Sequence, residues 1–397
     1  MTADLLLRNV RPWGGEPRDV AVLAGRIAPP GTLPPPGTAE VDGLGAILLP
    51  GLVEAHTHLD KTMLGMPWYR NEVGPRLIDR IENERVEKKR LGIEPHRQSM
   101  RQAVRCLGHG STHIRSHVDV DTEIGLAGIE GVMATREAMR GWIDIEIVAF
   151  PQSGLLARPG TLELLEEALR MGSEVVGGLD PCGIDADPKG HLDAIFGLAE
   201  RHGKPLDIHL HETGELGAFS TRLILDRTRA LGMQGRVTIS HAFCLGSTEP
   251  GLVEPLLDGI AELDVRIMTL GTASRPVPPI LPLTARGITV CSGNDGIRDT
   301  WNPYGNGDML ERAMLLGLRN NCRRDDEVEV ALRVCTEGGA RTMALEGYGV
   351  APGCRADLVL VEGETLAEAV VNHAPRPLVV KAGRVVARGG KALVQAP

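Results

Sequence analysis

Short apolar runs alternate through the middle of the chain with longer stretches in which apolar residues recur every three or four positions. The short runs are typical of buried parallel strands, and the longer stretches of amphipathic helices. Eight runs predict strands: Leu52 to His56, Thr112 to Val118, Ile143 to Phe150, Glu174 to Leu179, Leu206 to Leu210, Arg236 to His241, Val265 to Leu270 and Ile288 to Ser292. The clearest helical stretches are Gly160 to Met171, His191 to His202, Phe219 to Leu231 and Pro250 to Leu263. Alternation of this kind predicts an α/β protein with a (β/α)8 TIM barrel.

The two ends of the chain have a different pattern. Residues 1–49 and 346–397 contain short apolar runs separated by turns rich in Gly and Pro, which predicts strands rather than helices. Each end is too short to bury a core by itself. We therefore expect one small composite β-sandwich domain, built from both termini, beside a barrel of residues 50–345. Within the barrel, the charged stretch 63–92 predicts a loop and a helix over the barrel mouth.

Composition and charge narrow the class of protein. The chain has 397 residues, enough for a barrel of roughly 250 residues and a smaller domain. Its net charge of -9, with no basic block, disfavours nucleic acid as a partner. No apolar run is long enough to span a membrane and no signal peptide is evident, so we expect a cytoplasmic protein with no membrane partner. Seven scattered cysteines without a C-x-x-C pair argue against a disulfide framework. Association into a homo-oligomer is left open.

Polar side chains gather where the predicted strands end. The first strand ends in His56 and His58, and side chains two apart on a strand point to the same side, so both imidazoles aim at one point. Such a pair suits a metal ion, although two structural histidines would look the same. Later strand ends contribute further candidates: His117, Asp119, Gln152, Asp180, His209, His211, Glu212, His241 and Asp295. Because barrel active sites form at the carboxyl ends of the strands, this ring of residues predicts a catalytic site.

Five segments carry a more specific likeness. PGLVEAHTHLDK, IVAFPQ, DIHLHET, TISHAF and CSGND occur in this order and resemble the amidohydrolase superfamily, in particular its cytosine deaminase and isopropylammelide aminohydrolase branch. The resemblance extends to the closing KAGRVVARGGK. It implies a metal-dependent hydrolytic deaminase that releases ammonia from an amino-substituted N-heterocycle, such as a cytosine-like pyrimidine, a pterin or a triazine.

The resemblance also implies roles for individual residues. One divalent metal, zinc or iron(II), would be bound by His56, His58, His209 and Asp295. His241 would hold or deprotonate the attacking water, and Asp295 could share the proton. Glu212 would carry a proton to the ring nitrogen and then to the departing ammonia, and Gln152 would hydrogen-bond the ring carbonyl and N–H. The fourth strand is not followed by the lysine of two-metal relatives, so a single metal is expected.

Several positions depart from the cytosine deaminase pattern. Gly296 stands where a second aspartate is expected, so we expect extra space beside the ring and a substrate other than cytosine. Asp180 is a candidate to bind an amino or ring N–H group. Trp301 is one of several aromatic residues near these segments, which suggests a flat ligand. His211 is expected to be structural and Lys61 to be solvated, while the roles of His117 and Asp119 stay open.

Two other functions are compatible with the same segments. One is a cyclic amide hydrolase on the same scaffold, which would open the ring instead of releasing ammonia. The other is a barrel that binds a ligand without catalysis. The second alternative would be expected to lack a metal ligand or the proton-carrying carboxylate, whereas this chain has a candidate for each.

Overall fold

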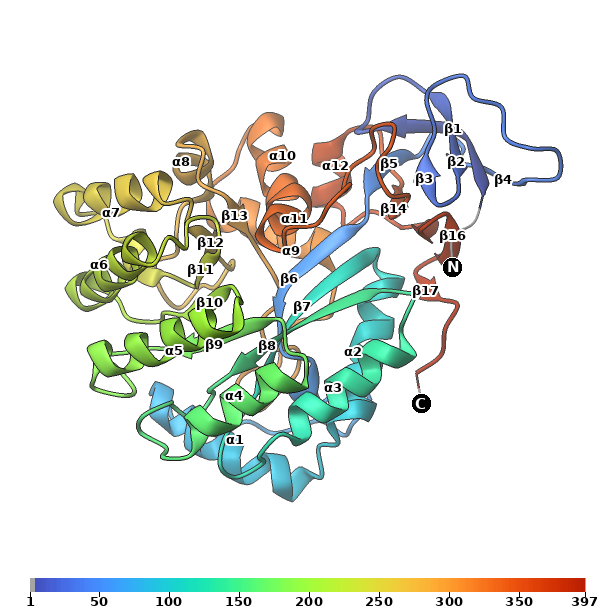
Figure 1. Ribbon diagram of the computed structural model, residues 1–397. Coiled ribbons are helices and arrows are strands. Elements are labelled where there is room, and N and C mark those ends of the chain that lie inside the picture. Colours follow the sequence, from blue (N-terminus) through green and yellow to red (C-terminus); the bar gives the residue numbers. More distant parts are fainter. Residues whose placement is uncertain (1–3, 397) are drawn as a thin grey trace.

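Eight parallel strands form the barrel expected from the middle of the chain (Figure 1). In the computed structural model, which describes residues 4–396, each strand pairs with its neighbour in sequence. The barrel strands are β6 (Leu52–Thr57), β7 (Ser111–Asp119), β8 (Asp144–Phe150), β9 (Val175–Leu179), β10 (Leu206–His209), β11 (Val237–Ser240), β12 (Arg266–Met268) and β13 (Val290–Cys291). Nearly all of their residues are buried, as in parallel sheets that helices cover. All eight predicted strands are confirmed, with ends that differ by up to two residues.

Helices surround the barrel, and the four clearest predicted helices are confirmed as α4 to α7 (Figure 1). The charged stretch before the second barrel strand forms α1, followed by α2. The helices are η1 (Leu59–Lys61), α1 (Leu77–Leu91), α2 (Pro95–Gly108), α3 (Ala127–Ala138), α4 (Thr161–Met171), α5 (Pro188–His202), α6 (Gly214–Ala230), η2 (Phe243–Gly246), α7 (Pro250–Glu262), α8 (Ile280–Ala285), α9 (Met309–Arg319), α10 (Asp325–Arg333), η3 (Val334–Gly338), α11 (Gly339–Thr342) and α12 (Leu366–Val371).

The barrel closes where the segment after β13 meets β6. The Ala55 amide donates to the Ser292 carbonyl at 3.2 Å, and the Asp295 amide donates to the His56 carbonyl at 2.9 Å. Gly293 makes this approach feasible, because a Cβ atom there would lie 2.1 Å from the His56 carbonyl oxygen. Closure therefore places Asp295 directly beside the two histidines at the end of β6.

Both termini build a second, mixed sheet of nine strands. Its main path runs β17-β16-β15-β14-β5-β1-β2-β3, and β4 pairs with β1. The antiparallel pair of β5 with β14 joins the two ends of the chain. The sheet's strands are β1 (Leu5–Pro12), β2 (Arg18–Leu23), β3 (Arg26–Ile27), β4 (Ala39–Asp42), β5 (Ile47–Pro50), β14 (Leu358–Val361), β15 (Leu378–Lys381), β16 (Arg384–Arg388) and β17 (Lys391–Ala392). This membership supports the domain division that we propose, at 49/50 and 345/346.

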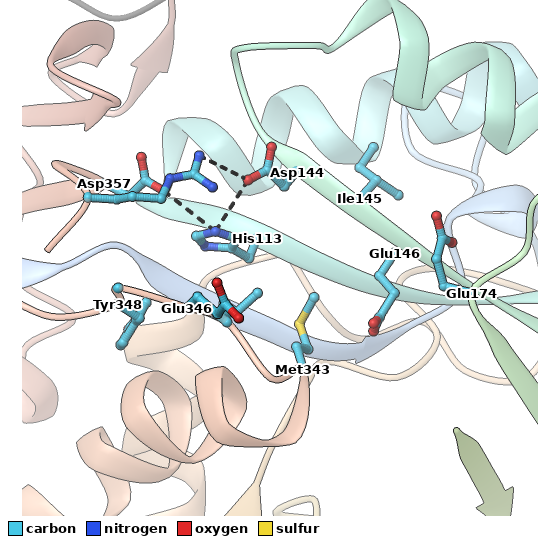
Figure 2. A pocket seen from close by; sticks show the side chains of 12 residues that line it. His113, Asp144, Ile145, Glu146, Glu174, Met343, Glu346, Tyr348 and Asp357 are labelled. Atoms are coloured by element: carbon cyan, nitrogen blue, oxygen red, sulfur yellow. Dashed lines mark hydrogen bonds and ion pairs between the residues drawn. The ribbon is translucent and has the colours of Figure 1, made fainter. Parts of the chain in front are cut away.

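A buried lysine attaches the small sheet to the barrel. Lys381, at the end of β15, donates to Asp144 Oδ2 at 2.7 Å, to Asp357 Oδ2 at 2.9 Å and to the Thr112 carbonyl at 3.1 Å. Figure 2 shows His113 between the same two carboxylates. Asp144 begins β8 and His113 lies near the start of β7, so this network lies at the amino-terminal end of the barrel. The carboxyl-terminal end is thereby left for a catalytic site.

Candidate active site

Four predicted site residues converge at the carboxyl ends of the barrel strands. His56, His209, His241 and Asp295 each place one nitrogen or oxygen atom within 4.8 Å of the others. His56 belongs to β6 and His209 to β10, whereas His241 and Asp295 follow β11 and β13. The residues are far apart in sequence, and the closed barrel brings them to one point.

His58 approaches the same carboxylate from beside this group. Its Nε2 atom lies 3.1 Å from Asp295 Oδ1, and the Nε2 atom of His56 lies 3.6 Å from that oxygen. The structure thus brings together all five residues predicted to bind the metal or the attacking water. The tightest group of four contains His241 rather than His58, so the division of roles between these two stays a prediction.

The histidines have the properties of metal ligands. His56 Nε2, and both ring nitrogens of His209 and of His241, are buried without a hydrogen-bond partner in the described part of the chain. Burial lowers the pKa of His209 and His241 well below the ordinary range. Burial and the nearby positive charge of Lys61 lower the pKa of His58 to about 4. Neutral imidazoles with free lone pairs and a nearby carboxylate are the donor set of a catalytic zinc or iron(II) ion. The cost of leaving buried nitrogens unpaired supports a bound ion.

A chain of hydrogen bonds orients the ring of His56. His56 Nδ1 lies 3.1 Å from Ser240 Oγ, and that hydroxyl donates to Asp207 Oδ1 at 2.6 Å. Arg115 in turn donates to Asp207 Oδ2 at 3.0 Å. The ring is therefore fixed through Nδ1, and Nε2 faces the cluster. Outer partners of this kind commonly hold the ligands of metal sites in place.

The backbone is strained at the same strand ends. His241 and Asp295 have φ values of 70° and 60°, and Asp180, after β9, has φ of 34°. Residues other than glycine seldom adopt this left-handed conformation, which costs free energy. Strained residues tend to cluster at functional sites, and two of these three belong to the tight group of four.

Glu212 lies in the loop wall beside the cluster. Its Oε1 atom accepts hydrogen bonds from the amides of Cys182 and Gly183, each at 2.8 Å, and its Oε2 atom accepts one from the Ser220 hydroxyl. Burial raises the pKa of the Glu212 carboxyl, and the Ser220 hydroxyl opposes that rise. A carboxyl group whose pKa is moved towards neutrality can exchange a proton during catalysis, which supports the predicted role.

Asp180 has a partner within the protein. Its two carboxylate oxygens accept hydrogen bonds from the backbone amide and from Nδ1 of His211, both at 2.6 Å. The predicted contact of Asp180 with the substrate stays a prediction. The ring of His211 stacks on that of His241 with 4.4 Å between centroids. The structural role expected for His211 agrees with these contacts.

The expectation that Lys61 is solvated is wrong. Only 3% of its surface is exposed, and its ammonium lies among Asp119, Gln152 and Glu84. Lys88 also pairs with Asp119. Glu84 and Lys88 come from α1, and sequence reasoning missed them because a charged helix usually carries its charges in solvent. Their spacing of four residues, which places both on one helix face, is the signal that could have indicated them.

The space expected beside Gly296 is filled. A Cβ atom on Gly296 would lie 1.8 Å from Asp299 Oδ2, so the carboxylate of Asp299 occupies the position of the missing side chain. Asp299 is buried, and its Oδ1 atom accepts from the amides of Trp301 and Asn302. Burial raises the pKa of Asp299 to about 7. Trp301 donates through Nε1 to Glu84 at 2.8 Å, and its predicted contact with the substrate stays a prediction.

Comparisons with known proteins agree with this geometry. The model of the amidohydrolase family matches residues 39–387. The chain is 31% identical, over 88% of each protein, to N-isopropylammelide isopropyl amidohydrolase from Pseudomonas sp. strain ADP. The crystal structure of N-isopropylammelide isopropylaminohydrolase from Burkholderia multivorans superposes on the chain with a TM-score of 0.95. The alignment covers 98% of this chain and all of that one, with 53% sequence identity.

A deaminase structure is also similar. The 5-methylcytosine deaminase from Klebsiella pneumoniae, liganded with 5-fluorocytosine, is 25% identical with a TM-score of 0.84, covering 98% of this chain and 99% of that one. No helix among residues 4–396 is both long and apolar enough to cross a membrane. The predicted fold and the predicted reaction class, hydrolysis of a C–N bond, are confirmed. The chain belongs to the amidohydrolase family and is a metal-dependent hydrolytic enzyme of its deaminase class.

Proposed function

We propose that this enzyme removes the alkylamino group of an N-alkylated, oxo-substituted triazine such as N-isopropylammelide, with release of the free amine. The cluster of His56, His209, His241 and Asp295 carries the proposal of hydrolysis, because five of its six ring nitrogens are buried without a partner among residues 4–396. The choice of ring is supported by the 53% identity to the aminohydrolase from Burkholderia multivorans over nearly the whole chain.

The metal in this proposal is a single zinc or iron(II) ion. His56, His58, His209 and Asp295 would hold it, and the free nitrogens and close carboxylate fit either ion. Such an ion, when bound, supplies Lewis acidity and lowers the pKa of water. Burial opposes ionisation of Asp295, but the adjacent rings of His56 and His58 hold the pKa of that carboxyl well below its usual range. Asp295 is therefore ionised near neutral pH, as a ligand must be.

The chain's own residues then move protons and hold the ring. His241, neutral because burial lowers the pKa of its ring, takes a proton from the attacking water. Glu212 protonates the ring nitrogen beside the attacked carbon, then takes the proton of the newly attached hydroxyl and delivers it to the leaving amine. The proton held by His241 restores Glu212 for the next turnover. Gln152 hydrogen-bonds the ring. The C–N bond to the substituent breaks, a C–O bond replaces it, and the ring stays closed.

The cysteines are those expected of a protein in a reducing compartment. All seven cysteines are free thiols. Free, mostly buried cysteines are typical of proteins kept in the cytoplasm, where disulfides are rare. We therefore include a cytoplasmic location in the proposal.

Amine release from a panel of rings tests the proposal. Enzyme loaded separately with zinc and with iron(II) is incubated with N-isopropylammelide, cytosine, isocytosine and a pterin, and the products are identified by mass spectrometry. We expect isopropylamine and an intact ring carrying a third carbonyl. A ring-opened acid would instead establish the cyclic amide hydrolase, and no product from a metal-loaded enzyme on N-isopropylammelide would contradict the proposal.

A further inference from the structure

The ammonium of Lys61 uses all of its hydrogen-bond donors within the protein. It contacts Asp119 Oδ1 at 3.2 Å, Glu84 Oε1 at 3.2 Å and Gln152 Oε1 at 3.1 Å. A lysine ammonium has three N–H donors and no acceptor. Lys61 therefore has no donor left for a substrate, and a hydrogen-bonded effect on the substrate would pass through one of these three partners.

The position of this ammonium is fixed from several sides. Asp119 is fully buried at the end of β7 and also pairs with Lys88. Glu84 is held on its other oxygen by the indole N–H of Trp301, at 2.8 Å. Burial opposes the charge of Lys61, but the carboxylates of Asp119 and Glu84 raise the pKa of its ammonium above the ordinary value. Lys61 is therefore a permanent, immobile cation next to Gln152.

This cation determines which way the amide of Gln152 faces. An ammonium can only donate, so the amide oxygen turns towards Lys61, and the reversed amide would set two N–H donors against a positive charge. In the described chain, Gln152 Nε2 donates to no protein group. The side chain is only 5% exposed, and in the proposed function the bound ring supplies the acceptor for this N–H group.

We infer that Lys61 is a positioning residue for specificity: it holds the Gln152 amide with Nε2 as the donor, so that the site selects rings with a carbonyl oxygen at that position over rings with an amino group. The inference rests on the proposed function, in which Gln152 binds the ring. It goes beyond that function, because it states which end of the amide meets the ring and why. A carbonyl oxygen accepts the Nε2 hydrogen, whereas an amino group would oppose donor with donor.

Two triazines that differ only at the ring carbonyls test the inference. The first is N-isopropylammelide, with two carbonyls, and the second has both carbonyls replaced by amino groups, so that turning the ring over cannot restore the contact. The measured quantity is the ratio of kcat/KM for the two rings, from isopropylamine release, with metal content recorded for each protein. In Lys61→Met the amide can reverse, and we expect this ratio to fall at least about tenfold, the scale of one charge-assisted hydrogen bond.

Two further variants keep the test decisive if Lys61→Met folds poorly. Gln152→Glu keeps the shape and the partner Lys61 but offers the ring a carboxylate oxygen, so the preference should move towards the amino ring. Lys88→Met removes the other lysine on Asp119 without touching Gln152, and it should leave the ratio unchanged. A ratio that is the same in wild type, Lys61→Met and Gln152→Glu would overturn the inference while leaving the proposed function intact. Absence of isopropylamine from wild type with either ring would overturn both.

Discussion

The carboxylate of Asp299 occupies the place where a side chain at Gly296 would begin. An ideal Cβ atom on Gly296 would lie 1.8 Å from Asp299 Oδ2 and 2.8 Å from its carboxyl carbon. Asp299 cannot easily move away, since its other oxygen accepts from the amides of Trp301 and Asn302 at 2.8 and 3.0 Å. The glycine that distinguishes this chain from the cytosine deaminase pattern is therefore linked to a carboxylate three residues later.

Gly296→Ala should lower the free energy of unfolding by about 1–3 kcal/mol, because a methyl group must displace a pinned, buried carboxylate. Urea unfolding of the metal-loaded protein measures this change. Gly251→Ala is the matched control, since a Cβ atom at Gly251 meets nothing within 4 Å. If the two variants are equally stable, Asp299 is not fixed in the way described. The same crowding means that Gly296→Asp alone should not create a cytosine site.

Asp299→Asn should change how stability depends on pH. Burial raises the folded-state pKa of Asp299 from 3.8 to about 7, so the folded state keeps a proton that the unfolded state releases over this interval. Asp299 therefore contributes stability that is fully present below about pH 4 and is lost as pH rises through about 7. Relative to the variant, wild type should lose stability between these limits. Unfolding of both proteins at pH values from 4 to 8 measures the difference, and parallel curves would contradict the prediction.

The barrel was predictable because its signals are local. Buried parallel strands are nearly continuous apolar runs, and the helices between them carry a regular apolar face, so element type and order follow from the pattern. Strand ends such as those of β13 (Val290–Cys291) were less predictable, since pairing with the neighbouring strand decides where a strand stops. The pair His56 and His58 could be predicted as well, because its spacing of two residues at a strand end is also a local pattern.

The charged partners of the site were not predictable in this way. Lys61, Glu84 and Asp119 form one buried group, but they come from three elements separated by up to 58 residues. Lys61 and Glu84 each have the sequence context of a solvated charge, and Asp119 is a strand-end candidate without an evident partner. Only tertiary packing, which removes water from all three at once, makes their pairing necessary. The same reason explains why Asp299 could not be connected with Gly296.

His58→Gln and His241→Gln should separate the metal ligands from the residue that deprotonates water. We expect His58→Gln to lose bound metal and activity together. His241→Gln should retain metal, while kcat falls at least about 100-fold, as for the loss of a general base. Metal analysis after gel filtration, with His202→Gln on α5 as control, measures the outcome. Loss of metal from His241→Gln with retention in His58→Gln would exchange the two roles, in agreement with the tight group of four.

Glu212→Gln should keep the fold and the metal but lower kcat at least about 100-fold, because an amide cannot carry the proton. Ser220→Ala should have a subtler effect. It removes a donor that favours the ionised carboxylate, so the pKa of Glu212 should rise. Because Glu212 must be protonated to act as the acid, the alkaline limb of kcat/KM should move to higher pH. Thr221→Val is the control, since its hydroxyl donates to the Gly217 carbonyl instead. An unchanged alkaline limb in Ser220→Ala would separate Glu212 from the proton transfer.

Lys381→Met should destabilise the whole protein without altering catalysis by the folded enzyme. The substitution removes the ammonium partner of the buried carboxylate Asp357, and removal of one member of a buried ion pair costs about 3–5 kcal/mol. The network lies at the amino-terminal end of the barrel, opposite the catalytic strand ends, so kcat and KM at low temperature should match wild type.

Denaturant unfolding distinguishes this effect from a general loss of charge. Lys391, on the exposed strand β17, provides the control Lys391→Met, which should change the free energy of unfolding by less than about 0.5 kcal/mol. Because Lys381 joins β15 to the start of β8, its loss should also let the small sheet unfold before the barrel. A second transition, or an apparent m value lower than that of wild type, would report this uncoupling. A single transition with wild-type midpoint would mean that the apolar contacts between sheet and barrel are sufficient without the lysine.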